Sequence, residues 1–130
     1  MRHTQLTLAQ SITNKVNQLQ DFTHTIVERE PSGRYVVATK NLFKGEHTNK
    51  VYNMLEVITD GIEEARSRGC DSIGGWMDSE AGVYYVDMCV HFAYKSEAMQ
   101  VAIANNEIAI YDLFENKEIN VEQYIKETLL

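Results

Sequence analysis

The stretch DSIGGWMDSEAGVYYVDMCVHFAYKSEAMQVAIANNEIAIYDLF, residues 71–114, decides the fold of this chain. It opens with a short β-rich segment and a glycine-containing loop, and then enters Val83–Phe92, where side-chain character alternates at every residue. A helical segment and a second β-rich segment, Glu107–Leu113, follow. Period-two alternation bounded by turn residues is typical of strands. The stretch therefore predicts a hairpin, a helix and a further strand that belong to one sheet.

The alternation also predicts which side of the strand Val83–Phe92 is buried, because successive side chains of a strand point to opposite faces. The even-numbered positions are apolar or aromatic and are expected to form the core face: Tyr84, Val86, Met88, Val90 and Phe92. The odd-numbered positions mix aromatic and polar side chains and form the second face: Tyr85, Asp87, Cys89 and His91.

The N-terminal part of the chain predicts a helix and a hairpin. The helix is expected over Thr7–Gln20, since Thr7 and Gln10 have the spacing of a capping box. The hairpin is expected within His24–Lys40, with its turn at Glu30–Gly33 and a polar loop over Asn41–His47 after it.

The remaining segments predict three more helices. The longest covers Asn49–Arg68 and is capped by Thr48, and its internal Gly61 suggests a close approach to the sheet. A short one is capped by Ser96 and ends at Asn105–Asn106, and a terminal one follows Asn120. In the strand Glu107–Leu113, Ile108 and Ile110 are expected to point inward.

These elements predict a single α+β domain over residues 1–130. The expected sheet is mostly antiparallel, has about five strands and carries the helices on one face. The segment Arg34–Leu113 has the element order of a ferredoxin-like βαββαβ core, with N- and C-terminal helices added to it.

The composition argues against some classes of function. The 130 residues carry a formal net charge of −7, which argues against direct binding of nucleic acid, because that requires clustered Lys and Arg. The first residues, MRHTQLTLAQ, do not resemble a signal peptide, and no apolar run reaches the length of about 20 residues that crosses a bilayer. We therefore expect a cytoplasmic protein without membrane contact, in which Cys70 and Cys89 are free thiols.

The strings GGWMDSEAGVYYVD (residues 74–87) and AIYDLFENKEI (residues 109–119) carry a resemblance to known proteins. They are similar to small proteins of bacteriophages and mobile elements, which share a Gly-Gly-Trp, an Asp, a Gly-x-Tyr-Tyr-x-Asp strand and a later Ala-Ile-Tyr-Asp-Leu strand. That family brings no established activity with it. The resemblance implies an accessory protein in the host cytoplasm that binds and disables a host factor.

One strand places three chemically capable side chains on the same face: Asp87, Cys89 and His91. A Cys–His pair can generate a thiolate nucleophile, and the same residues with a carboxylate can begin a metal site. Both chemistries need further ligands or an oxyanion hole, and His3, His24 and His47 have no paired spacing. We favour the alternative that these residues line a sheet face covered by a helix or a partner, and expect no catalytic residue, metal or cofactor.

Aromatic residues gather around the central hairpin, at Trp76, Tyr84, Tyr85, Tyr111 and Phe114. Such residues dominate protein interfaces, and they also stack on bases or nucleotides. The residues predicted to bind a partner are Trp76, Asp78, Tyr85, Asp87, His91 and Tyr111. We expect a non-enzymatic protein that binds and inhibits or sequesters a host protein and forms a homo-oligomer, most simply a dimer. The alternative is a small-ligand or nucleotide-binding domain, or a small enzyme, that uses the Asp87–Cys89–His91 face.

Overall fold

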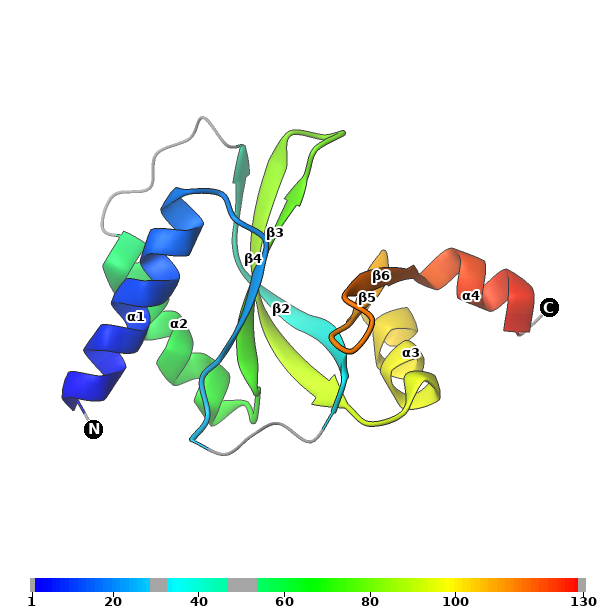
Figure 1. Cartoon of the computed structure of the whole chain (residues 1–130), viewed down its shortest axis with the longest axis horizontal. Helices are drawn as coiled ribbons and strands as arrows, with labels where there is room; N and C mark the ends of the chain where they lie inside the picture. The colour runs from blue at the N-terminus through cyan, green and yellow to red at the C-terminus, as the bar shows by residue number, and fades with distance from the viewer. Residues whose placement is uncertain (1, 29–32, 47–53, 129–130) are drawn as a thin grey trace.

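Six strands form one antiparallel sheet in the computed structural model, which describes residues 2–28, 33–46 and 54–128 (Figure 1). The strands are β1 (Phe22–Thr25), β2 (Tyr35–Glu46), β3 (Ser72–Asp78), β4 (Val83–Phe92), β5 (Ala109–Asp112) and β6 (Lys117–Asn120). The helices are α1 (Arg2–Asn17), α2 (Met54–Ser67), α3 (Lys95–Ala104) and α4 (Val121–Thr128). The strands lie in the order β1-β3-β4-β2-β5-β6. The predicted α+β class with an antiparallel sheet is confirmed.

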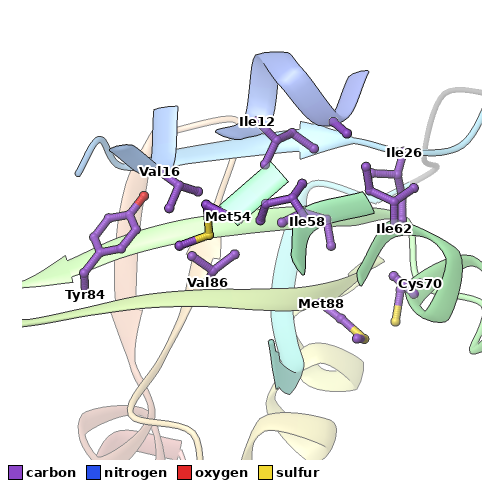
Figure 2. Packing of buried hydrophobic residues seen from close by; sticks show 13 residues of the cluster. Ile12, Val16, Ile26, Met54, Ile58, Ile62, Cys70, Tyr84, Val86 and Met88 are labelled. Atoms are coloured by element: carbon purple, nitrogen blue, oxygen red, sulfur yellow. The ribbon is translucent and has the colours of Figure 1, made fainter. Parts of the chain in front are cut away.

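Strand β4 has the predicted bounds, and its even-numbered residues face a core. Tyr84, Val86 and Met88 are at most 1% exposed and pack beneath α1 and α2. Figure 2 shows Ile12 of α1 and Ile58 of α2 above these strand residues. The core extends through α2, where a side chain on Gly61 would collide with Leu42 of β2, so the predicted close approach of this glycine to the sheet is confirmed.

A second core lies under α3 and α4 on the same side of the sheet. Tyr35 and Val37 of β2 pack there against Ala98, Met99 and Ala102 of α3, together with Ile110 and Val121. Val37 is the register partner of Val90, which packs against the first core. The two cores therefore meet on one face of the sheet, and the odd-numbered residues of β4 point to the opposite face.

The sheet curls because β2 is irregular at its centre. Its register against β4 shifts between Ala38 and Lys40 and again between Asn41 and Phe43. Such irregularities bend a strand and increase its twist. The bend turns the hairpin β5–β6 toward the β3–β4 hairpin, so the face opposite the helices becomes concave.

Two predictions about the strands are wrong. The expected hairpin within His24–Lys40 does not form, because β1 pairs with β3 while β2 lies between β4 and β5. The expected loop Asn41–His47 is a continuation of β2 as far as Glu46. The sheet has six strands in the described residues where about five were expected, since the polar segment Lys117–Asn120 adds β6. The turn Glu30–Ser32 and His47 lie outside the described residues.

Several helix boundaries also differ from those expected. Helix α1 begins at Arg2, so Thr7 lies inside it and is not a cap. Helix α3 begins at Lys95 with Tyr94 as its N-cap, so Ser96 is not the capping residue. Thr48 and the expected first turn of α2 lie outside the described residues. Asn120 does cap α4, because its Oδ1 accepts a hydrogen bond from the Gln123 backbone N at 2.8 Å.

Candidate functional site

The concave face of the sheet lines an open cavity of about 710 Å³. Strands β2, β3 and β4 form its floor, and the chain between Asn106 and Glu118, which includes β5, forms the facing wall. Val36, Tyr85 and Tyr111 line it from three different strands. The cavity therefore depends on the curl of the sheet, and it lies on the face opposite the described helices.

The space above the cavity floor is not filled at Gly74, because glycine has no side chain. Gly74 is the register partner of Asp87, so a side chain at this position would point into the cavity. A Cβ atom there would lie 3.2 Å from Cys89 Sγ and 3.5 Å from the Phe22 carbonyl oxygen. The neighbouring Gly75 serves the opposite face, where a Cβ atom would collide with the Phe22 ring and the Tyr84 hydroxyl.

The aromatic wall is built from Trp76 and Tyr85, which are register partners on adjacent strands. Their ring centroids are 5.3 Å apart, within the range of favourable aromatic contacts. Trp76 Nε1 donates a hydrogen bond to Glu118 Oε1 at 2.7 Å. This bond joins β3 to β6 and closes one side of the cavity.

Two carboxyl groups line the cavity, Asp87 on β4 and Glu107 on the facing segment. Asp87 Oδ1 accepts a hydrogen bond from Asn41 Nδ2 at 2.9 Å, and burial raises the pKa of this carboxyl. Burial and the negative charge of Asp87 raise the pKa of Glu107 to about 7. Among the described residues, the Glu107 carboxyl has no hydrogen-bond or ion-pair partner. A carboxyl pair of this kind can hold a cation or exchange a proton with a bound molecule.

Cys89 and His91 share the odd face of β4, and their side chains bind different partners, the Asp87 carbonyl oxygen and Ser72 Oγ. Burial, with the nearby charge of Asp87, raises the pKa of the Cys89 thiol, which keeps the sulfur protonated at neutral pH. His91 Nε2 hydrogen bonds to Ser72 Oγ at 2.8 Å. The His91 backbone N donates to Asp71 Oδ2 at 2.9 Å. Through these contacts, His91 packs against Asp71 and Ser72 behind the cavity floor.

The six predicted partner-binding residues divide into two groups. Trp76, Tyr85, Asp87 and Tyr111 all line the cavity, so the curl brings them together. Asp78 ends β3 and its Oδ1 accepts hydrogen bonds from the backbone N of Glu80 and Ala81, which shapes the hairpin turn. His91 is 9% exposed and does not line the cavity.

Sequence reasoning missed Glu107 as a member of the site. Asp87 lies 20 residues earlier in the sequence, and the curl of the sheet brings both residues to one cavity. The available signal was the alternation of Glu107, Ala109 and Tyr111, which places a carboxyl on the same face as an aromatic ring. Ile108, which was expected to be buried, is 62% exposed.

Within residues 2–28, 33–46 and 54–128, no cluster of three or more His, Cys, Asp and Glu side chains is arranged to hold a metal ion. None of the helices in those residues combines the length and apolar character needed to span a membrane. Comparison with protein-family models, with curated protein sequences and with solved structures found no match for the chain.

Proposed function

We propose that this chain is a non-enzymatic binding protein whose concave cavity holds a small organic ligand. The observation that carries the proposal is the cavity itself, whose volume of about 710 Å³ is in the range of ligand sites. Ligand sites combine apolar and aromatic walls with a few convergent polar groups. Trp76 and Tyr85 supply the aromatic wall here, and Asp87 and Glu107 supply the polar groups.

Two features support binding over nucleophilic catalysis. The raised pKa of the Cys89 thiol, caused by burial, works against a thiolate at the floor of the cavity. Ser72 and His91 have the contact of a nucleophile with its base, but Ser72 is fully buried and lines no part of the cavity.

The test is a fragment screen by ligand-detected NMR with a variant that fills the cavity. Gly74→Leu places a large side chain on the floor, and Gly74→Ala places a smaller one there. Ala104→Leu is the matched control, because Ala104 is exposed at the end of α3 and does not line the cavity. Melting curves establish that each variant is folded.

The proposal predicts fragments that bind the wild type and Ala104→Leu, bind Gly74→Ala more weakly, and do not bind Gly74→Leu. Fragments that bind all four proteins equally would place the binding site elsewhere. A library that produces no binder of the wild type would contradict the proposal.

A second candidate function is the binding of a protein partner, such as a host factor or a second copy of this chain. The specific observation in its favour is a set of exposed apolar side chains beside the cavity: Ile108 at 62%, Leu113 at 39% and Phe114 at 80% exposure. Exposed aromatic side chains such as Phe114 are enriched at protein interfaces. The resemblance to bacteriophage proteins is compatible with this function.

This second candidate is separated from the first by Phe114→Asp. Loss of a protein complex or of a dimer in Phe114→Asp, measured by sedimentation, combined with unchanged fragment binding, would support a protein-binding surface. Sedimentation of the wild type as a monomer at micromolar concentration would contradict the dimer.

We also propose that β2 to β5 form a ferredoxin-like unit. Support comes from the order β3-β4-β2-β5 within an antiparallel sheet and from the sequence of elements strand, helix, strand, strand, helix, strand. Strands β1 and β6 then extend this unit at its two edges.

A further inference from the structure

We infer that the cavity selects an organic cation with a flat apolar body, and that Asp87 and Glu107 bind the cationic group while Tyr85 and Trp76 contact the body. This inference rests on the proposed function and adds the chemical class of the ligand. It follows from the charges, the hydrogen bonds and the rings that line the cavity.

The aromatic wall already attracts a cation of the chain itself. Lys44 Nζ lies 5.5 Å from the centroid of the Tyr85 ring. An ammonium group within about 6 Å of a ring face is attracted by the negative charge of that face. Tyr85 and Trp76 stand side by side on this wall, with their ring centroids 5.3 Å apart.

The charged groups that line the cavity favour a cation. Among the described residues, carboxyl groups outnumber ammonium groups by four to two. Lys40 Nζ lies 2.6 Å from Glu64 Oε2, an oxygen that also accepts from Arg68 Nε at 2.8 Å. The cavity is therefore negative, and an anionic or phosphate-bearing ligand would be repelled by it.

The hydrogen bonds distinguish Glu107 from the other carboxyl groups that line the cavity, each of which has one oxygen bound. Glu118 accepts from the Trp76 indole, and Asp21 Oδ1 accepts from the Met77 backbone N at 3.0 Å. Asp87 is bound by Asn41 through Oδ1 only, and the Glu107 carboxyl has no partner among the described residues. A bound cation would fill this position and would offset the negative charges of Asp87 and Glu107, where burial and then the charge of Asp87 raise the pKa of Glu107.

The test compares three molecules of the same shape and different charge: benzamidine, which is cationic, benzamide, which is neutral, and benzoate, which is anionic. Trp76 is the one tryptophan of the sequence, so its indole NMR signal reports the cavity without interference. The titrations are made at pH 8, above the pKa of about 7 at Glu107, where this carboxyl is ionised.

The expected result is a saturable shift of the Trp76 signal with benzamidine, with an affinity at least tenfold higher than that of benzamide or benzoate. The double substitution Asp87→Asn with Glu107→Gln should lower the benzamidine affinity at least tenfold, because both side chains keep their shape and lose their charge. The matched control is Asp60→Asn with Glu97→Gln, which removes two exposed carboxyl groups outside the cavity and should leave the affinity unchanged.

Three results would overturn the inference: equal binding of the three molecules, preference for benzoate, or unchanged benzamidine affinity in the Asp87→Asn and Glu107→Gln protein. If benzamide or benzoate binds and Gly74→Leu abolishes that binding, the cavity is still a ligand site and only the cationic class is wrong. If no compound shifts the Trp76 signal, the inference is overturned, and the fragment library with Gly74→Leu decides the proposed function separately.

Discussion

Trp76 and Glu118 lie on strands at different parts of the sheet, and a hydrogen bond of 2.7 Å from the indole Nε1 to the carboxylate joins them. Strands β4, β2 and β5 lie between their two strands in the sheet order. The contact exists because β2 bends at its register shifts, and it holds the two arms of the curled sheet around the cavity. It links the fold directly to the candidate site.

Glu118→Ala removes the acceptor of this bond. The free energy of unfolding of this variant is expected to fall by about 1 kcal/mol, which is the usual contribution of a hydrogen bond. The Trp76 fluorescence should shift to the red, because the indole loses its partner and gains water. Glu118→Gln keeps an acceptor oxygen and serves as the control. Identical emission spectra of Glu118→Ala and wild type would show that the bond does not hold Trp76 in place.

Val86→Asp tests the assigned faces of β4. Val86 is 0% exposed under the helices, so this change buries an unpaired charge and should lower the free energy of unfolding by more than about 4 kcal/mol. Val83→Asp is the control, because Val83 is the first residue of the same strand and is only half-buried. A wild-type denaturation midpoint for Val86→Asp would contradict the register.

Glu107→Gln tests the carboxyl pair through the pH dependence of stability. Burial and Asp87 raise the pKa of Glu107 from an ordinary 4.5 to about 7 in the folded state. Between these values the folded state holds a proton that the unfolded state has released, so Glu107 lowers stability as pH rises. Because this carboxyl is partly exposed and screened, the variant should melt about 1–3 °C higher at pH 8 and less than that at pH 5.

Other titratable groups near the cavity also contribute to the pH dependence of stability. Asp87 also has a pKa raised by burial and remains in the variant, so part of the pH dependence persists. His91 has a pKa lowered by burial and changes stability in the acidic range, where protonation favours the unfolded state. A Tm gain for Glu107→Gln that is the same at pH 5 and pH 8 would contradict the assigned pair.

The cysteines give a test by thiol labelling. Both are free and buried, at 2% exposure for Cys70 and 5% for Cys89, and burial raises the pKa of Cys89. Labelling of both thiols with a disulfide reagent should therefore be at least tenfold slower in the native protein than in denaturant, since the thiolate is the reactive form. Rapid labelling of native Cys89 would show that the cavity floor opens to solvent.

Local patterns in the sequence predicted the β3–β4 hairpin well. The alternation of Val83–Phe92 placed Tyr84, Val86 and Met88 in the core, because a strand face is a property of neighbouring residues. The partner strand of β1 could not be predicted from local patterns. The segment that begins at His24 was expected to pair with the next strand along the chain, whereas β1 (Phe22–Thr25) adds to β3 about 50 residues later. Nothing in the composition of such a short segment specifies its partner.

In the candidate site, too, residues close together in the sequence were predicted, and a residue placed there by a distant segment was not. Trp76, Tyr85 and Asp87 belong to one hairpin and were predicted together. Glu107 was missed because its position depends on the bulges of β2, where polar residues such as Asn41 resemble a loop but pair with Asp87 in the sheet. Asn41 contributes to the cavity because its side-chain amide orients the Asp87 carboxyl.

A crystal structure of the protein soaked with benzamidine tests the central claim most directly. The account predicts density for the amidinium group between Asp87 and Glu107, with the ring against Tyr85, while the bond from Trp76 to Glu118 remains intact. An empty cavity, or benzamidine bound only at the exposed surface around Phe114, would contradict it.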